Sequence, residues 1–98
     1  MTLTELKYIV SVEKALHFGQ AAKACLVSQP TLSVAIQKLE NELNLKIFER
    51  SSTVSGVVIT PFGHVIIAQA KKVLQEAENL KELARRMEST TRPVAELP

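Results

Sequence analysis

The sequence predicts a mainly α fold: a winged helix-turn-helix with a two-stranded β-hairpin as its wing, followed by one long dimerisation helix. Three observations support this prediction. Apolar residues at helical spacing mark three helices in the first half of the chain, and a tight turn joins the second to the third. Two β-prone runs follow the third helix, and a long apolar heptad repeat follows them.

Length and composition indicate one small globular domain. The chain has 98 residues, of which 46% are hydrophobic and 22% are charged, and its formal net charge is +2. This charge excludes a polybasic protein but permits DNA binding. The low aromatic content, 4% with no tryptophan, argues against a protein that stacks on single-stranded bases.

The chain carries no pattern typical of secretion or membrane insertion. Its one cysteine, Cys25, excludes an intramolecular disulfide, and the N-terminal residues lack the basic and apolar regions of a signal peptide. No apolar run approaches the ~20 residues that a membrane span needs. We therefore expect a cytoplasmic protein.

The first two helices follow from apolar spacing and small residues. The first is expected to begin at a possible N-cap, Thr4, and to end near Leu16. A short second helix is expected from Phe18 to Cys25, and its alanines let a neighbouring helix approach closely. His17 would then lie at the junction between the two helices.

The third helix has two different faces. Ser28 is expected as its N-cap and Pro30 in its first turn, where a missing N–H costs nothing. One face is apolar and is predicted to be buried: Leu32, Ile36, Leu39 and Leu43. The other face is uncharged and rich in hydrogen-bonding groups, and we expect it to meet base edges: Gln29, Pro30, Thr31, Ser33, Val34 and Gln37.

A small hairpin is predicted after the third helix. The β-prone runs 46–50 and 57–60 are joined by the polar stretch 51–56. Two strands are only marginally stable alone, so the hairpin must pack on the helices. Phosphate contacts are expected from the third helix and the wing: Ser28, Lys38, Arg50, Ser51, Ser52 and Thr53.

A long helix is predicted from Pro61, after Thr60 as N-cap, to about Glu88. Its apolar residues alternate at spacings of four and three, as in a coiled coil: Ile66, Ala70, Val73, Ala77, Leu80, Ala84 and Met87. Such a helix would be ~42 Å long, too long to pack along its whole length on so small a core. The expected division is a winged domain over 1–60, a linker helix that pairs with a second copy over 61–89, and a hinge tail over 90–98.

Several short motifs stand together in one order. They are FGQAA at 18–22, VSQPTLS at 27–33, KLENEL at 38–43, FER at 48–50 and TPFG at 60–63. Over residues 1 to about 90 the chain resembles the N-terminal DNA-binding region of the LysR-type transcriptional regulators. Within that family, the opening MTLTEL, HFG at 17–19 and the QA at 69–70 are similar to the peroxide-sensing branch.

The resemblance implies that the partner is double-stranded DNA with a dyad-symmetric operator. It implies a homodimer through antiparallel linker helices, tetramers of the intact regulator, and a C-terminal effector domain outside this chain, which would make the chain a fragment. Positions 29–31 and 33 match the family's recognition helix, and Arg50 matches the arginine that begins the wing. Unlike many relatives, this wing has no basic residue over 51–59, so hydroxyls and backbone amides would make its contacts.

Other hypotheses concern single parts of the chain. The long helix is also compatible with a helical protein-interaction module that docks in a groove on a different protein. Cys25 lies on an apolar helix with no second cysteine in the chain, as expected of an inert buried thiol. His17 and His64 lack ligand-spaced companions, so we expect no metal, cofactor or catalytic site.

Overall fold

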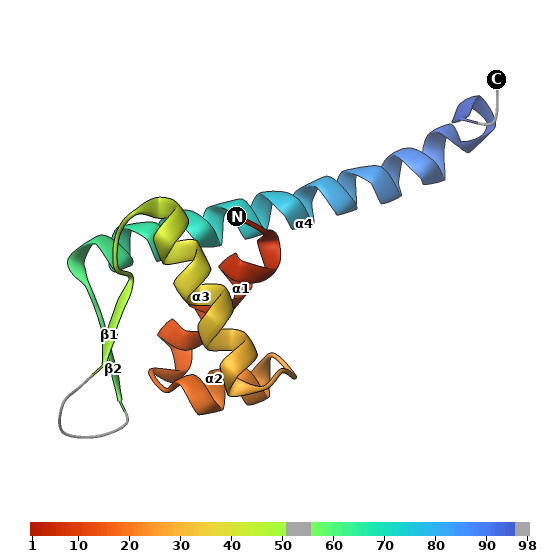
Figure 1. The fold of residues 1–98 in the computed structure, drawn as a ribbon. Helices are drawn as coiled ribbons and strands as arrows, with labels where there is room; N and C mark the ends of the chain where they lie inside the picture. The colour runs from red at the N-terminus through yellow and green to blue at the C-terminus, as the bar shows by residue number, and fades with distance from the viewer. Residues whose placement is uncertain (51–55, 96–98) are drawn as a thin grey trace.

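The computed structural model describes residues 1–50 and 56–95, with side chains described over 1–50 and 56–88. Its elements are α1 (Leu3–Ala15), α2 (Phe18–Ala24), α3 (Gln29–Leu43), β1 (Phe48–Arg50), β2 (Val57–Ile59) and α4 (Pro61–Ala95). The first three helices lie against the first half of α4, the hairpin hangs from its beginning, and the rest of α4 extends beyond them (Figure 1). This confirms the predicted winged helix-turn-helix with a long C-terminal helix.

The start of α1 differs from the sequence prediction, which placed its N-cap at Thr4. The cap is Thr2, whose hydroxyl accepts the N–H of Glu5 at 3.1 Å, while the Glu5 carboxylate accepts the N–H of Thr2 at 3.1 Å. Only Thr2 has a glutamate three residues later, and this reciprocal capping box satisfies two otherwise unpaired amides. The predicted end near Leu16 is confirmed, because Leu16 is the C-cap.

The hydrophobic core lies where α1 meets the other three helices. Its largest fully buried side chains come from α1, α3, the segment before β1, and α4: Ile9, Val12, Leu32, Leu39, Ile47 and Ile67. Full burial of each contributes about 1.5–3 kcal/mol, so these contacts determine how α3 is oriented on the rest of the domain. Of the predicted core face of α3, Leu32, Ile36 and Leu39 are buried and Leu43 is partly buried.

The hairpin is held to the helices by hydrogen bonds at its base. β1 and β2 are antiparallel, with Phe48 opposite Ile59. The buried carboxylate of Glu40 in α3 accepts the N–H groups of Ile47 at 2.8 Å and Phe48 at 3.1 Å. The Thr60 hydroxyl donates to the carbonyl of Lys46 at 2.6 Å. The predicted packing of the wing on the helices is therefore confirmed.

α4 begins as predicted but ends later. The Thr60 hydroxyl accepts the N–H of Gly63 at 2.8 Å, which caps the helix. The helix then continues to Ala95, through the segment 89–93 that was expected to break it. Serine and threonine lower helix propensity by less than ~1 kcal/mol each, too little to stop a helix that is already propagating. Pro93, whose cost in a helix interior is ~3 kcal/mol, comes only just before the helix ends at Ala95. The predicted hinge tail is thus helical over 90–95, and residues 96–98 lie outside the described part.

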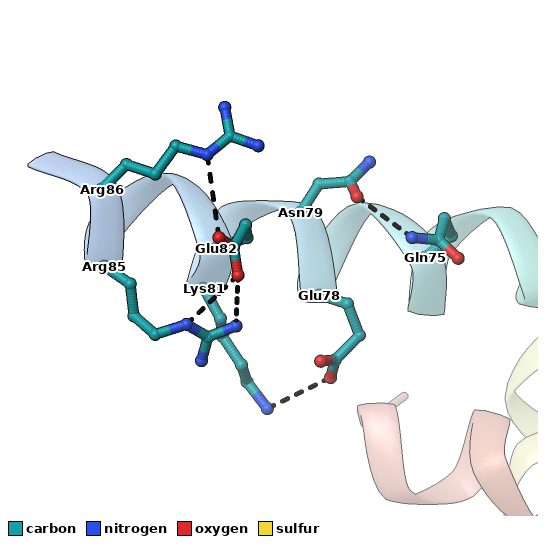
Figure 2. Close-up of polar contacts among 7 residues, drawn as sticks. All are labelled: Gln75, Glu78, Asn79, Lys81, Glu82, Arg85 and Arg86. Carbon is teal, nitrogen blue, oxygen red and sulfur yellow. Dashed lines mark hydrogen bonds and ion pairs between the residues drawn. The ribbon is translucent and has the colours of Figure 1, made fainter.

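Polar side chains on the extended part of α4 pair along the helix itself (Figure 2). Lys81 contacts Glu78 at 3.3 Å, Glu82 contacts both Arg85 at 2.7 Å and Arg86 at 3.7 Å, and Gln75 donates to Asn79 at 3.0 Å. Exposed pairs at these spacings contribute a few tenths of a kcal/mol each. They help to stabilise a helix that has left the domain core.

An exposed apolar stripe runs along α4. We use this name for Phe62, Val65, Val73, Leu80 and Leu83, which are 69%, 66%, 37%, 67% and 52% exposed. Ala70 was predicted to lie in the same seam, but it is only 3% exposed because it packs into the domain's own core. Within the described residues, no helix combines the length and the hydropathy that crossing a membrane requires.

Candidate nucleic-acid interface

The turn between α2 and α3 places the start of α3 at the surface. Leu26 has φ 60°, a left-handed conformation that costs a residue with a side chain about 1–2 kcal/mol. The N–H of Val27 then bonds to the carbonyl of Ala22 at 3.0 Å, which closes α2. Glycine is the usual residue where φ is positive, and here an exposed leucine takes that position.

Ser28 caps α3 as predicted. Its hydroxyl accepts the N–H of Thr31 at 3.2 Å and donates to the hydroxyl of Thr31 at 2.9 Å. With Pro30 in the first turn, the helix begins at Gln29. The first turn of α3 therefore carries short polar side chains on a well-defined N-terminus.

The predicted base-side residues of α3 lie on its outer face. Five of them are exposed and Ser33 is partly buried: Gln29, Pro30, Thr31, Val34 and Gln37 are the exposed ones. The same helix turns Leu32, Ile36 and Leu39 into the core. Hydrogen-bonding groups and two apolar side chains, Pro30 and Val34, are thus presented outward, the chemistry that base edges and thymine methyl groups can meet.

A groove of about 370 Å³ separates this face from the hairpin. Ser33 and Gln37 line it from α3, while Lys46 and Arg50 line it from the hairpin side. Two cations and two hydrogen-bonding side chains on opposite walls suit a phosphate chain running between them. The groove is also lined by Glu40, whose carboxylate is bonded to the amides of Ile47 and Phe48, and by Glu49. Lys38, also predicted to contact phosphate, is exposed on α3.

Arg50 is held at the edge of the groove by an aromatic ring. Its Cζ lies 4.8 Å from the centre of the Phe18 ring. Phe18 in turn meets Phe48 edge to face, with ring centres 6.0 Å apart and an angle of 83° between the planes. Neither contact was predicted, because residues 18, 48 and 50 come from elements that only the tertiary fold brings together.

Glu40 is the functional-site neighbour that sequence reasoning missed. Glu40 is only 8% exposed, and its carboxylate anchors the start of the wing through the N–H groups of Ile47 and Phe48. The only sign of this role in the sequence is that Glu40 directly follows Leu39, a residue predicted to be buried. The predicted phosphate-side residues Ser51, Ser52 and Thr53 lie outside the described residues.

The histidine and cysteine near the start of α2 and at its end have structural surroundings. The ring Nδ1 of His17 accepts the N–H of Gln20 at 3.0 Å and caps α2, which confirms His17 as the junction between the first two helices. Cys25 is a partly buried free thiol at the end of α2. Over the described part of the chain, no group of three or more His, Cys, Asp or Glu residues could hold a metal ion.

A capped third helix with an exposed polar face, a tight turn before it and a hairpin beside it define a winged helix-turn-helix domain, the class that places one helix in the DNA major groove. The chain belongs to the lysR family of bacterial regulatory helix-turn-helix proteins, whose family model matches residues 3–64.

Similar proteins agree with this assignment. The DNA-binding transcriptional dual regulator OxyR of Escherichia coli K12 is 44% identical over 84 residues, which cover 86% of this chain and 27% of that protein. The full-length OxyR structure from Pseudomonas aeruginosa is 56% identical, with a TM-score of 0.81 over 88% of this chain and 28% of that one. The BenM_DBD/benA site 1 DNA complex is 36% identical, with a TM-score of 0.84 over 92% of this chain and 99% of that one.

The chain spans about a quarter of the length of the OxyR proteins it resembles. The predicted family is confirmed, and so is the resemblance to the peroxide-sensing branch within it.

Proposed function

We propose that this chain is the sequence-specific, double-stranded-DNA-binding domain of a LysR-family transcriptional regulator and that it works as a homodimer in the bacterial cytoplasm. The observation that carries the proposal is the exposed face of α3, from Gln29 to Gln37, opposite a buried leucine and isoleucine face. The similar BenM domain, described as a complex with benA site 1 DNA, supports it. A Haemophilus influenzae relative named hydrogen peroxide-inducible genes activator, 44% identical over 84 residues, supports a role of the whole regulator in oxidative-stress control.

In this proposal the outer face of α3 enters the major groove and the hairpin follows the adjacent backbone or minor groove. Base edges would be met by Gln29, Pro30, Thr31, Ser33, Val34 and Gln37, and phosphates by Ser28, Lys38 and Arg50, with Ser51, Ser52 and Thr53 in the wing. Glutamine can bond adenine through two groups at once, whereas lysine attracts every phosphate alike. Specificity would therefore come from α3 and general affinity from the cations.

Two copies would bind two halves of one dyad-symmetric operator. The apolar stripe of α4 supports this part of the proposal, because a partner helix would cover side chains that water now meets. The seam would then contain Ile66, Val73, Ala77, Leu80, Ala84 and Met87 with Phe62, Val65 and Leu83. The division into a winged domain over 1–60 and a linker helix from 61 is part of this proposal, with the linker extended to Ala95, where α4 ends.

The Gln29→Ala variant is expected to lose base preference rather than all affinity. We expect a loss of ~1–3 kcal/mol on the preferred duplex and little loss on random duplex, because a base contact counts only on the correct base. Lys38→Ala is the matched control on the same helix: it should weaken both duplexes alike and reduce the salt dependence of binding.

The measurement starts from a random duplex pool, from which the wild-type chain selects its preferred sequence, followed by titration of both variants at several salt concentrations. Equal losses on selected and random DNA from Gln29→Ala would contradict the role of Gln29. A wild-type chain that enriches no duplex at low salt would contradict the proposed function itself and favour a protein-interaction module.

A further inference from the structure

We propose that Phe18 is a positioning residue for DNA binding: its ring holds the Arg50 guanidinium at the edge of the groove, ready to meet a phosphate. This inference rests on the proposed function, in which Arg50 contacts the DNA backbone. It adds a residue that does not touch the DNA at all.

The ring of Phe18 is itself fixed in place. Phe18 is the first residue of α2 and only 8% exposed, so packing leaves its ring little freedom. Phe48, 5% exposed, presses edge to face on this ring and lies two residues before Arg50 on β1. The same aromatic pair therefore fixes both the ring and the strand from which Arg50 extends.

The contact fixes the arginine side chain without neutralising it. The Arg50 Cζ stands 4.8 Å from the ring centre, within the range of a cation–π contact. Stacking uses the flat face of the guanidinium, whereas phosphate oxygens bind the N–H groups at its edge. The ion pairs found among the described residues involve other cations, and of the two carboxylates that line the groove with Arg50, that of Glu40 is bonded to the amides of Ile47 and Phe48, while the other belongs to Glu49.

Holding the side chain before binding lowers the entropy lost when DNA arrives. Immobilising one long side chain costs about 0.5–1.5 kcal/mol, so its earlier restriction is expected to be worth about 2- to 10-fold in affinity. The contact also links α2 to the wing, since it joins the first residue of α2 to the last residue of β1. This link helps to keep a fixed distance between the two walls of the groove, which are α3 and the hairpin.

The test compares Phe18→Leu with Phe18→Tyr in the presence and absence of Arg50. Phe18→Leu keeps an apolar side chain but removes the ring face, and we expect it to bind the selected duplex about 2- to 10-fold more weakly. Phe18→Tyr keeps the face and should restore nearly wild-type affinity. In an Arg50→Ala background, Phe18→Leu should cause no further loss, because the two residues act as one unit.

Tyr8→Leu is the matched control, since it removes a buried ring of α1 that is not part of the Phe18–Phe48 pair, and it should leave the affinity for the selected duplex near that of the wild type. Thermal unfolding of every variant separates loss of fold from loss of binding. If a Phe18 variant does not fold, the inference can still be tested on the wild-type chain by NMR. The side-chain protons of Arg50 should show upfield chemical shifts caused by the Phe18 ring. Missing shifts, or an equal effect of Phe18→Leu with and without Arg50, would overturn the inference, whereas failure of the wild type to select a duplex would overturn the proposed function instead.

Discussion

Replacing Gly63 by alanine is expected to lower the free energy of unfolding by about 3 kcal/mol. A Cβ at this position would overlap the carbonyl oxygen of Ile47 and lie 3.0 Å from the carbon of that carbonyl. The oxygen cannot move away, because it accepts the N–H of Thr60 at 3.0 Å. The base of the wing and the first turn of α4 would have to separate. Urea unfolding followed by circular dichroism measures the loss.

Gly19→Ala is the matched control for this prediction. A Cβ there would lie 2.9 Å from Cε1 of His17, a side-chain ring that can rotate. Rotation would lose the cap that His17 gives α2, about 1 kcal/mol, while the change from glycine to alanine inside a helix gains a similar amount. We therefore expect a net change below ~1 kcal/mol. Equal losses at the two glycines would show that the backbone contact of Gly63 is not the cause.

The helices could be predicted from the sequence because their signals are local. Ser28 with Pro30, and Thr60 with Pro61, combine a capping hydroxyl and a first-turn proline, and both begin helices in the structure. The apolar spacing in α3 was enough to separate its buried face from its exposed face. These patterns depend on residues within one or two turns of each other, so no tertiary information was needed.

The rest of the site depends on contacts between distant segments. The buried role of Glu40 follows from two amides in the segment leading into β1, and nothing within α3 shows where those amides lie. Ala70 fits the heptad spacing equally well whether the domain core or a second copy covers it, and only the fold shows that it is the core. The ring of Phe18 and the guanidinium of Arg50 are likewise joined only by the folded chain.

The exposure of the seam residues decides which substitution tests dimerisation best. Phe62, Val73 and Leu80 fall on one face of α4 at about 100° per residue, and this face points away from the buried Ile67. The C-terminal half of α4 extends beyond the other helices (Figure 1), and Leu80 is 67% exposed. A substitution there therefore tests pairing between copies without disturbing the core.

Leu80→Arg is expected to convert dimers into monomers and to lower affinity for a duplex with two half-sites about 100-fold or more. A bulky charge in an apolar helix seam prevents close pairing. Without pairing, the second half-site is no longer bound at the high effective concentration that a linked copy provides. Sedimentation velocity measures the oligomeric state, and titration of duplexes with one or two half-sites measures the coupling.

Gln75→Arg places the same charge on the polar side of α4, where Gln75 now bonds the exposed Asn79, and should leave the dimer intact (Figure 2). For Leu80→Arg, affinity for a single half-site should stay within a factor of about two of wild type, because α3 and the wing are untouched. The comparison of the two duplexes therefore separates loss of dimerisation from loss of base recognition by α3. A Leu80→Arg protein that remains dimeric would mean that the stripe does not join two copies, and the protein-interaction hypothesis for α4 would then gain its support.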